Sequence, residues 1–411
     1  MFSVQAERRL ILLSAGTVAR RQAARTLAAE LASDIDWPRL IATLRARRLL
    51  ALLGPRIVEL VDPLVDPTVG DRGPDPTGGD PGPSGARELA DAVAQVLALG
   101  RRRGVLLQLL TQRILAMLAD AGIRAAPLKG PLLGEALHGD PGRRLSSDID
   151  VLIPPRQLPQ AVAAVRELGY GEPTDHLLAD GLPLLHLRLL DALCRLPPLE
   201  LHWRVHWYER SFASERLLPP APDAAGAWRP APADELAELL LFYARDGFID
   251  LRIVTDIGAW WDARGEQLPP AGLAPLLDAH PALARVLIAA AAVAENVVGL
   301  PARRVLGDAV ALGPRGRLAA RLANPNPHSS QPQLYADMGL IDGLLAPRGG
   351  FRGFVRRQLL PPAEVLDQQA RHGQRHGKRS TLARFLGVLG RYGLTIARRT
   401  FTRASRPAVG R

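Results

Sequence analysis

The chain has 411 residues, of which 47% are apolar, and these values predict two or three packed units rather than a single core or a disordered chain. The longest apolar run, residues 286–294, is shorter than the ~20 residues that cross a bilayer, and the amino terminus lacks a secretory signal pattern. The single cysteine, Cys194, excludes an intramolecular disulfide and a zinc site built from several thiolates. We therefore expect a soluble protein of the reducing cytoplasm.

The formal net charge of +11 predicts a long-range attraction to polyanions. Only two of the 52 basic residues are lysines, Lys129 and Lys378, so arginine enrichment extends over the whole chain and is weak grounds for nucleic-acid binding. Against that background, a lysine at position 129 indicates a chemical role. An ammonium is a compact point charge that fits between phosphate oxygens, whereas a guanidinium needs a planar partner.

The first third of the sequence predicts helices. Residues 1–62 form a helical N-terminal region in which Asp36 is expected to cap a helix. Residues 63–86 are rich in Pro, Gly and Asp and predict a disordered linker, because such a composition cannot bury an apolar face. A long helical pattern follows over 88–120, with a break expected near the glycines at 100–104.

The periodicity changes after residue 122. Strand patterns lie at 123–128, 147–154, 182–189 and 199–206, with short helices at 131–138 and 156–168. Helical patterns return at 234–264 and 271–300, residues 324–332 predict a loop, and 333–411 predict a basic helical C-terminal region. The fold class expected from this order is α+β, with a small mixed β-sheet surrounded by helices.

Asp148 and Asp150 are the first candidate site residues. In a strand, their spacing places both carboxylates on one face while Ile149 points into the core. Two like charges at one site are stabilised by a cation between them, and hard oxygen ligands suit Mg²⁺ or Mn²⁺ bridged to phosphates. The alternative is a strand edge with both acids in water. The upstream turn at Lys129 and Gly130 favours the metal site.

Two further charged residues lie near this pattern in the sequence. Arg144 is interpreted either as a phosphate or orienting contact or as a surface arginine. Glu200, in the strand 199–206, could supply a third carboxylate as a metal ligand or general base. His202 and His206 would share its face, and without an HExxH arrangement we expect them to pack rather than to bind zinc.

Three motifs together resemble a family of nucleotidyltransferases in the polymerase beta-like superfamily. They are the LKG turn at 128–130, the R-x-x-x-D-I-D segment at 144–150 and the E-L-H-W strand at 200–203. The similarity covers most of residues 30–300. The sequence departs from the wider superfamily in having Lys129 and Gly130 where a Gly-Ser pair is usual, Ser147 where relatives often have Gly, and Glu200 where Asp is frequent.

The resemblance implies transfer of a nucleoside monophosphate from a nucleoside triphosphate, with release of pyrophosphate. Our leading hypothesis for the acceptor is a hydroxyl or amine of a small molecule, peptide or protein. It implies a nucleotidyltransferase core at 87–215 and a helical domain at 216–323. Asp148, Asp150 and Glu200 would be the catalytic and metal-binding acids. The residues implied to hold the nucleotide are Lys129, Gly130, Arg144 and Ser147.

Two other classes of function stay open. A non-catalytic nucleotide-binding regulator is disfavoured because it need not keep three acids. A basic scaffold would bind nucleic acid or a membrane through residues 371–411. The 5% aromatic content offers few platforms on which bases could stack, which disfavours a nucleic-acid acceptor.

Overall fold

The computed structural model of the protein describes residues 2–61, 84–173, 185–191, 193, 195–323, 325 and 331–347. Most of the linker predicted at 63–86, most of the loop predicted at 324–332 and the basic region beyond 347 lie outside the described residues. The predicted membrane- or nucleic-acid-binding segment 371–411 is therefore neither supported nor excluded.

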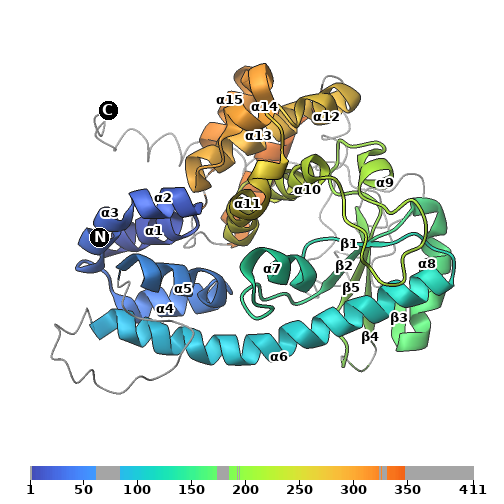
Figure 1. Ribbon diagram of the computed structural model, residues 1–411, viewed down its shortest axis with the longest axis horizontal. Helices are drawn as coiled ribbons and strands as arrows, with labels where there is room; N and C mark the ends of the chain where they lie inside the picture. Colours follow the sequence, from blue (N-terminus) through green and yellow to red (C-terminus); the bar gives the residue numbers. More distant parts are fainter. Residues whose placement is uncertain are drawn as a thin grey trace, which may run out of the picture.

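Five helices form the N-terminal region, at one end of the molecule (Figure 1). They are α1 (Phe2–Ser14), α2 (Val18–Ala23), α3 (Arg25–Ala32), α4 (Trp37–Ala46) and α5 (Leu50–Val61). Asp36 caps α4 as expected, because its carboxylate accepts a hydrogen bond from the backbone N–H of Arg39 at 3.1 Å.

A single helix of 37 residues, α6 (Ser84–Asp120), joins this region to the β-sheet. It runs along the base of the molecule in Figure 1 and spans roughly 55 Å. The break predicted near 100–104 does not occur. A Cβ on Gly100 would lie 2.7 Å from the carbonyl oxygen of Gly142, and one on Gly104 would lie 2.3 Å from that of Pro141. The two glycines instead allow the loop before β2 to cross the helix.

The five-stranded sheet has the order β1-β2-β5-β4-β3. Its strands are β1 (Ala126–Pro127), β2 (Ile149–Leu152), β3 (Tyr170–Pro173), β4 (His186–Asp191) and β5 (Leu199–His202). The β2–β5 pair is parallel and the other pairs are antiparallel, which confirms the mixed sheet. β3 was not predicted, and the strand expected at 199–206 ends at His202.

The two faces of the sheet have different environments. Ile149 and Val151 on β2, with Leu199 and Leu201 on β5, pack in a hydrophobic core against the C-terminal half of α6 and α8 (Leu158–Val165). Period-two alternation directs the intervening residues to the opposite face. That face carries the charged side chains described below.

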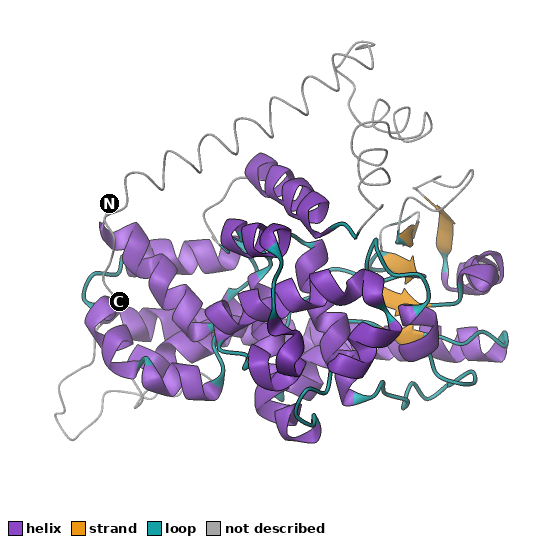
Figure 2. Cartoon of the chain, turned by 90° about the horizontal axis from the view of Figure 1, so that it is seen from above, coloured by secondary structure: helices purple, strands orange, loops and turns teal. Residues whose placement is uncertain are grey.

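Helices cover the charged face and extend from it; Figure 2 shows the strands confined to one end of a mainly helical molecule. The remaining α-helices are α7 (Pro131–His138), α9 (Phe212–Arg216), α10 (Pro232–Arg245), α11 (Leu251–Arg264), α12 (Ala274–Ala279), α13 (Pro281–Val298), α14 (Ala302–Leu306), α15 (Pro314–Leu322) and α16 (Gln331–Leu345). The short 3₁₀ helices are η1 (Pro155–Gln157), η2 (Arg166–Leu168), η3 (Gly265–Gln267) and η4 (Gly307–Val310). The α+β architecture expected from the sequence is therefore confirmed.

Among the described residues, α13 alone is long and apolar enough to cross a membrane. Half of that segment is buried within the fold, where it packs against α10, α11 and α15. Such packing against several other helices is typical of a helix in the core of a globular fold.

Candidate active site

Asp150 and Glu200 lie side by side on the charged face of the sheet. They are register partners on the parallel strands β2 and β5, so both carboxylates project in the same direction. Asp148 lies in a bend just before β2 rather than in the strand. Burial, with added repulsion from Asp150 and Glu200, raises the pKa of Asp148. The three predicted acids therefore come within electrostatic reach of one another.

His202 connects two of these acids. Its Nε2 donates to Oδ1 of Asp150 at 2.8 Å and lies 3.4 Å from Oε2 of Glu200. Because both partners are carboxylates, Nε2 carries the proton. The ring is fully buried, so its position is restricted by packing and its N–H holds the two carboxylates in a fixed orientation. The expected packing role for His202 is thus accompanied by a polar contact to both acids.

His186 on β4 was not recognised from the sequence. Its Nε2 lies 3.6 Å from Oε2 of Glu200, and its ring centroid is 4.7 Å from that of His202. Burial and the neighbouring His202 lower the pKa of His186 to about 4, so it is neutral at pH 7. Burial acts to raise the pKa of Glu200, but the hydrogen bond from His202 and the nearby His186 hold it below its usual value. Glu200 is therefore an ionised acceptor.

His206 does not join this cluster. The chain leaves the strand at His202, and the buried His206 accepts a hydrogen bond at Nδ1 from the backbone of Tyr208 at 3.2 Å. The sequence pattern placed it on the same face as Glu200 only because the strand was predicted to continue.

Lys129 reaches the acids from the end of β1. Its Nζ lies 3.5 Å from Oδ2 of Asp150 and 4.9 Å from the ring centroid of Phe242. Although burial favours the neutral acid, Lys129 and His202 hold the pKa of Asp150 well below its usual range. The ammonium thus stands at the border between the acids and helix α10.

Gly130 follows at the N-cap of α7. It has φ 112° and ψ −157°, a backbone conformation that is essentially restricted to glycine. No side chain caps the helix. The first turn of α7 therefore presents backbone N–H groups beside Lys129, an arrangement that suits anionic ligands such as phosphates.

Arg144 was interpreted as a phosphate contact, an orienting contact or a surface arginine, and the contacts it makes within the protein are those of an orienting residue. The side chain is buried, and its Nε donates to Oδ2 of Asp256 on α11 at 2.6 Å. His138 Nε2 lies 3.0 Å from the other oxygen of the same carboxylate. A Cβ on Gly134 would lie 2.7 Å from that of Arg144, so α7 approaches the arginine closely. Arg144 holds the segment before Asp148 in place. Ser147 lies in the same bend as Asp148.

Helix α10 adds residues that sequence reasoning did not identify. The ring of Phe242 contacts two cations, because Nζ of Lys129 lies 4.9 Å and the guanidinium carbon of Arg245 lies 4.5 Å from its centroid. Glu235, Glu238, Phe242 and Arg245 recur at helical spacing, which directs them toward one side of the helix. Charged and aromatic residues at helical spacing within an apolar helical pattern were the available sequence signal.

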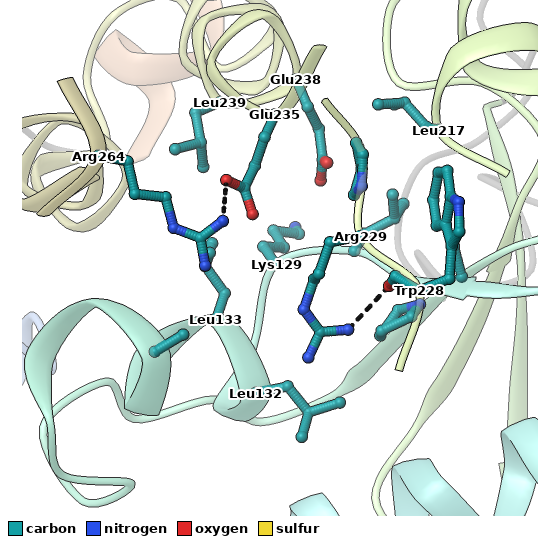
Figure 3. A pocket seen from close by; sticks show the side chains of 15 residues that line it. Lys129, Leu132, Leu133, Leu217, Trp228, Arg229, Glu235, Glu238, Leu239 and Arg264 are labelled. Carbon is teal, nitrogen blue, oxygen red and sulfur yellow. Dashed lines mark hydrogen bonds and ion pairs between the residues drawn. The ribbon is translucent and has the colours of Figure 1, made fainter. Parts of the chain in front are cut away.

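A cleft that is partly open to solvent adjoins Lys129 (Figure 3). It is bounded by β1, α7, the segment 228–230 and the N-terminal half of α10. Lys129 lines this cleft and also contacts Asp150, so the cleft and the acids are neighbouring parts of one region.

The donor set fits a divalent cation. The carboxylates of Asp148, Asp150 and Glu200 supply hard oxygen ligands of the kind preferred by Mg²⁺ and Mn²⁺. Imidazole N–H groups that orient ligating carboxylates are common around such sites. The ligand atoms of His186, Glu200 and His202 also lie within 4.8 Å of one another, which would admit a softer ion.

A family model described as uncharacterised nucleotidyltransferase matches residues 33–297. The match covers more than half of the chain and includes the whole sheet, Lys129, the three acids and helix α10. The chain therefore belongs to this family, and its class is that of a transferase. No curated protein and no solved structure matches the chain.

Proposed function

We propose that the protein is a Mg²⁺- or Mn²⁺-dependent nucleotidyltransferase that transfers a nucleoside monophosphate to a hydroxyl or amine. The observation that carries the proposal is the convergence of Asp148, Asp150 and Glu200 beside Lys129, at the start of α7. We also extend the family assignment to the polymerase beta-like superfamily, on the LKG, RxxxDID and ELHW motifs.

The residues around the acids suggest how each half of the reaction is supported. The compact ammonium of Lys129 and the uncapped first turn of α7 favour binding of the triphosphate. When bound at the carboxylates, a divalent ion would offset the negative charge of the phosphates and of the departing pyrophosphate. His202 would keep Asp150 and Glu200 oriented throughout, because its N–H contacts both.

The transfer forms one bond from the acceptor oxygen or nitrogen to the α-phosphorus and breaks the bond from that phosphorus to the bridging oxygen of pyrophosphate. The acceptor also loses a proton. Glu200 is ionised and mostly but not fully buried, so it is suited either to take this proton or to complete the ion's ligands. A small molecule, peptide or protein would serve as acceptor, in the cytoplasm, where triphosphates and Mg²⁺ are present.

The test is to incubate the purified full chain with each labelled nucleoside triphosphate, Mg²⁺ and a lysate that supplies acceptors. We expect pyrophosphate release and a labelled adduct from the wild type, and neither from Asp148→Asn. Asp120→Asn, an exposed acid at the end of α6, is the matched control and should retain activity. The proposal fails if no nucleotide gives a product and none binds in a Mg²⁺-dependent manner.

A further inference from the structure

The cleft beside Lys129 has a chemical character distinct from that of the acid site. Leu132, Leu133 and Leu239 give it apolar walls, and the indole of Trp228 lines one side (Figure 3). Arg229 is exposed at the cleft and donates to the backbone oxygens of Gly226 and Trp228. An apolar cleft with an aromatic wall and a few polar groups is the usual form of a small-molecule site.

Two neighbouring acids on α10 line this cleft and have different environments. The carboxylate of Glu235 accepts hydrogen bonds from Trp260 at 2.7 Å and from Arg264 at 2.8 Å. Glu238 is only 7% exposed and, within the described part of the chain, has no hydrogen bond or ion pair. The Glu238 oxygens are not among the fully buried atoms that lack a partner, so they open onto the cleft, where a ligand can complete their hydrogen bonds.

The protonation state of Glu238 narrows the class of that ligand. Burial, with a smaller contribution from Glu235, raises the pKa of Glu238 to about 8, so the carboxyl is neutral at pH 7. A neutral carboxyl presents an O–H donor beside a C=O acceptor. It therefore pairs with a base edge on which a donor and an acceptor lie side by side. Such edges are the ring nitrogen and amino group of adenine and cytosine and the ring N–H and carbonyl of guanine and uracil.

We infer that the cleft is the nucleobase subsite for the donor nucleotide, in which Trp228 contacts the base and Glu238 hydrogen-bonds to one of its edges. This rests on the proposed function, because Lys129 is the group shared by the cleft and the acids. One bound nucleotide can then have its phosphates at Lys129 and its base against the indole. Base–aromatic contacts of this kind contribute substantially to nucleotide affinity.

The experiment compares the Mg²⁺-dependent affinities of ATP, CTP, GTP, UTP and inorganic tripolyphosphate by calorimetry. Tripolyphosphate reports the phosphate subsite alone. The wild type should bind the nucleotide whose base edge fits Glu238 best at least about 10-fold more tightly than the one that fits worst, because a mispaired edge leaves the carboxyl unpaired. Glu238→Ala should abolish this preference, and Trp228→Leu should weaken all four nucleotides, while tripolyphosphate affinity stays unchanged in both.

Glu238→Gln tests the donor–acceptor role without removing the side chain. The amide keeps one acceptor and adds a donor that does not titrate, so the base preference should persist above pH 8, where the wild type loses it. Glu215→Gln, at an exposed acid on α9, is the matched control and should behave as the wild type.

Three results would overturn the inference. They are a wild type without base preference, a Glu238→Ala variant that keeps it, and variants in the cleft that change only the apparent affinity for the acceptor. Each of these leaves tripolyphosphate binding and pyrophosphate release intact, so the proposed function survives. If the wild type binds neither nucleotides nor tripolyphosphate, both proposals fall together.

Discussion

Nε of Arg144 lies 2.6 Å from Oδ2 of Asp256, in a buried ion pair that joins the segment before Asp148 to helix α11. The two residues are 112 positions apart in the sequence. The Asp256 carboxylate also contacts His138 at the end of α7. The carboxylate of Asp256 therefore positions three elements around the candidate site, namely α7, α11 and the segment before Asp148.

The first prediction concerns the stability that depends on this pair. Arg144→Ala leaves the buried Asp256 carboxylate with only His138 as a partner and should lower the free energy of unfolding by about 3–5 kcal/mol. Denaturant unfolding followed by circular dichroism measures this loss. Arg101→Ala removes a more exposed pair with Asp140 and should cost less than about 1 kcal/mol. Equal losses in the two variants would contradict a structural role for Arg144.

The second prediction separates activity from stability at Asp148. Burial and the repulsion from Asp150 raise the pKa of Asp148, so its ionised form destabilises the fold at pH 7. Asp148→Asn should therefore be at least as stable as the wild type at pH 7, with the gain disappearing in acid where the wild-type carboxyl is protonated. Transfer should fall by about 100-fold or more. Thermal melts at two pH values and pyrophosphate release provide the readouts.

The third prediction concerns the choice of lysine at position 129. Lys129→Ala should weaken binding of both nucleotides and tripolyphosphate, and Lys129→Arg should not restore it. The ammonium occupies the space between Asp150 and Phe242, in which a planar guanidinium cannot reproduce the contacts of a point charge. Full restoration by Arg would show that the position needs positive charge alone.

The fourth prediction distinguishes the two roles open to Glu200. If Glu200 is a metal ligand, Glu200→Gln should weaken Mg²⁺-dependent nucleotide binding and transfer together. If it takes the acceptor's proton, binding should persist while turnover falls by about 10²–10⁴-fold. Because the pKa of Glu200 is lowered, its ionised form stabilises the fold above its ordinary pKa, and this contribution is lost in acid. The stability cost of Glu200→Gln should therefore shrink as pH falls.

The sequence predicted the sheet and the neighbouring acids because these depend on local rules. Alternation along a strand placed Asp150 and Glu200 on the face opposite Ile149, and strand pairing then made them partners. The partner of Arg144 could not be predicted, because Asp256 comes from a helix that is distant in sequence. Gly100 and Gly104 show the same limit, since a glycine in a helix can indicate either a break or the close approach of another segment.

His186 and Glu238 were missed for a related reason. A histidine on a strand and a glutamate on a buried helix carry no motif, and their meaning depends on which side chains face them. The register of β4 with β5 places His186 opposite His202, and the cleft adjoins Glu238. Both features arise from tertiary packing.

The fifth prediction follows from the raised pKa of Glu238. Between the ordinary glutamate value of 4.5 and the folded value of about 8, the native state holds a proton that the unfolded chain has released. The unfolded state binds fewer protons in this window, so this group makes the free energy of unfolding decrease as pH rises, by about 1.4 kcal/mol per pH unit. Glu238→Gln carries no titrating proton and should lack this contribution.

The stability difference between the Glu238→Gln variant and the wild type should therefore grow from pH 5 to pH 8 and then level off. Denaturant unfolding over that range, with Glu215→Gln as the exposed control, measures the difference. A constant offset across the range would mean that Glu238 is ionised in the folded protein.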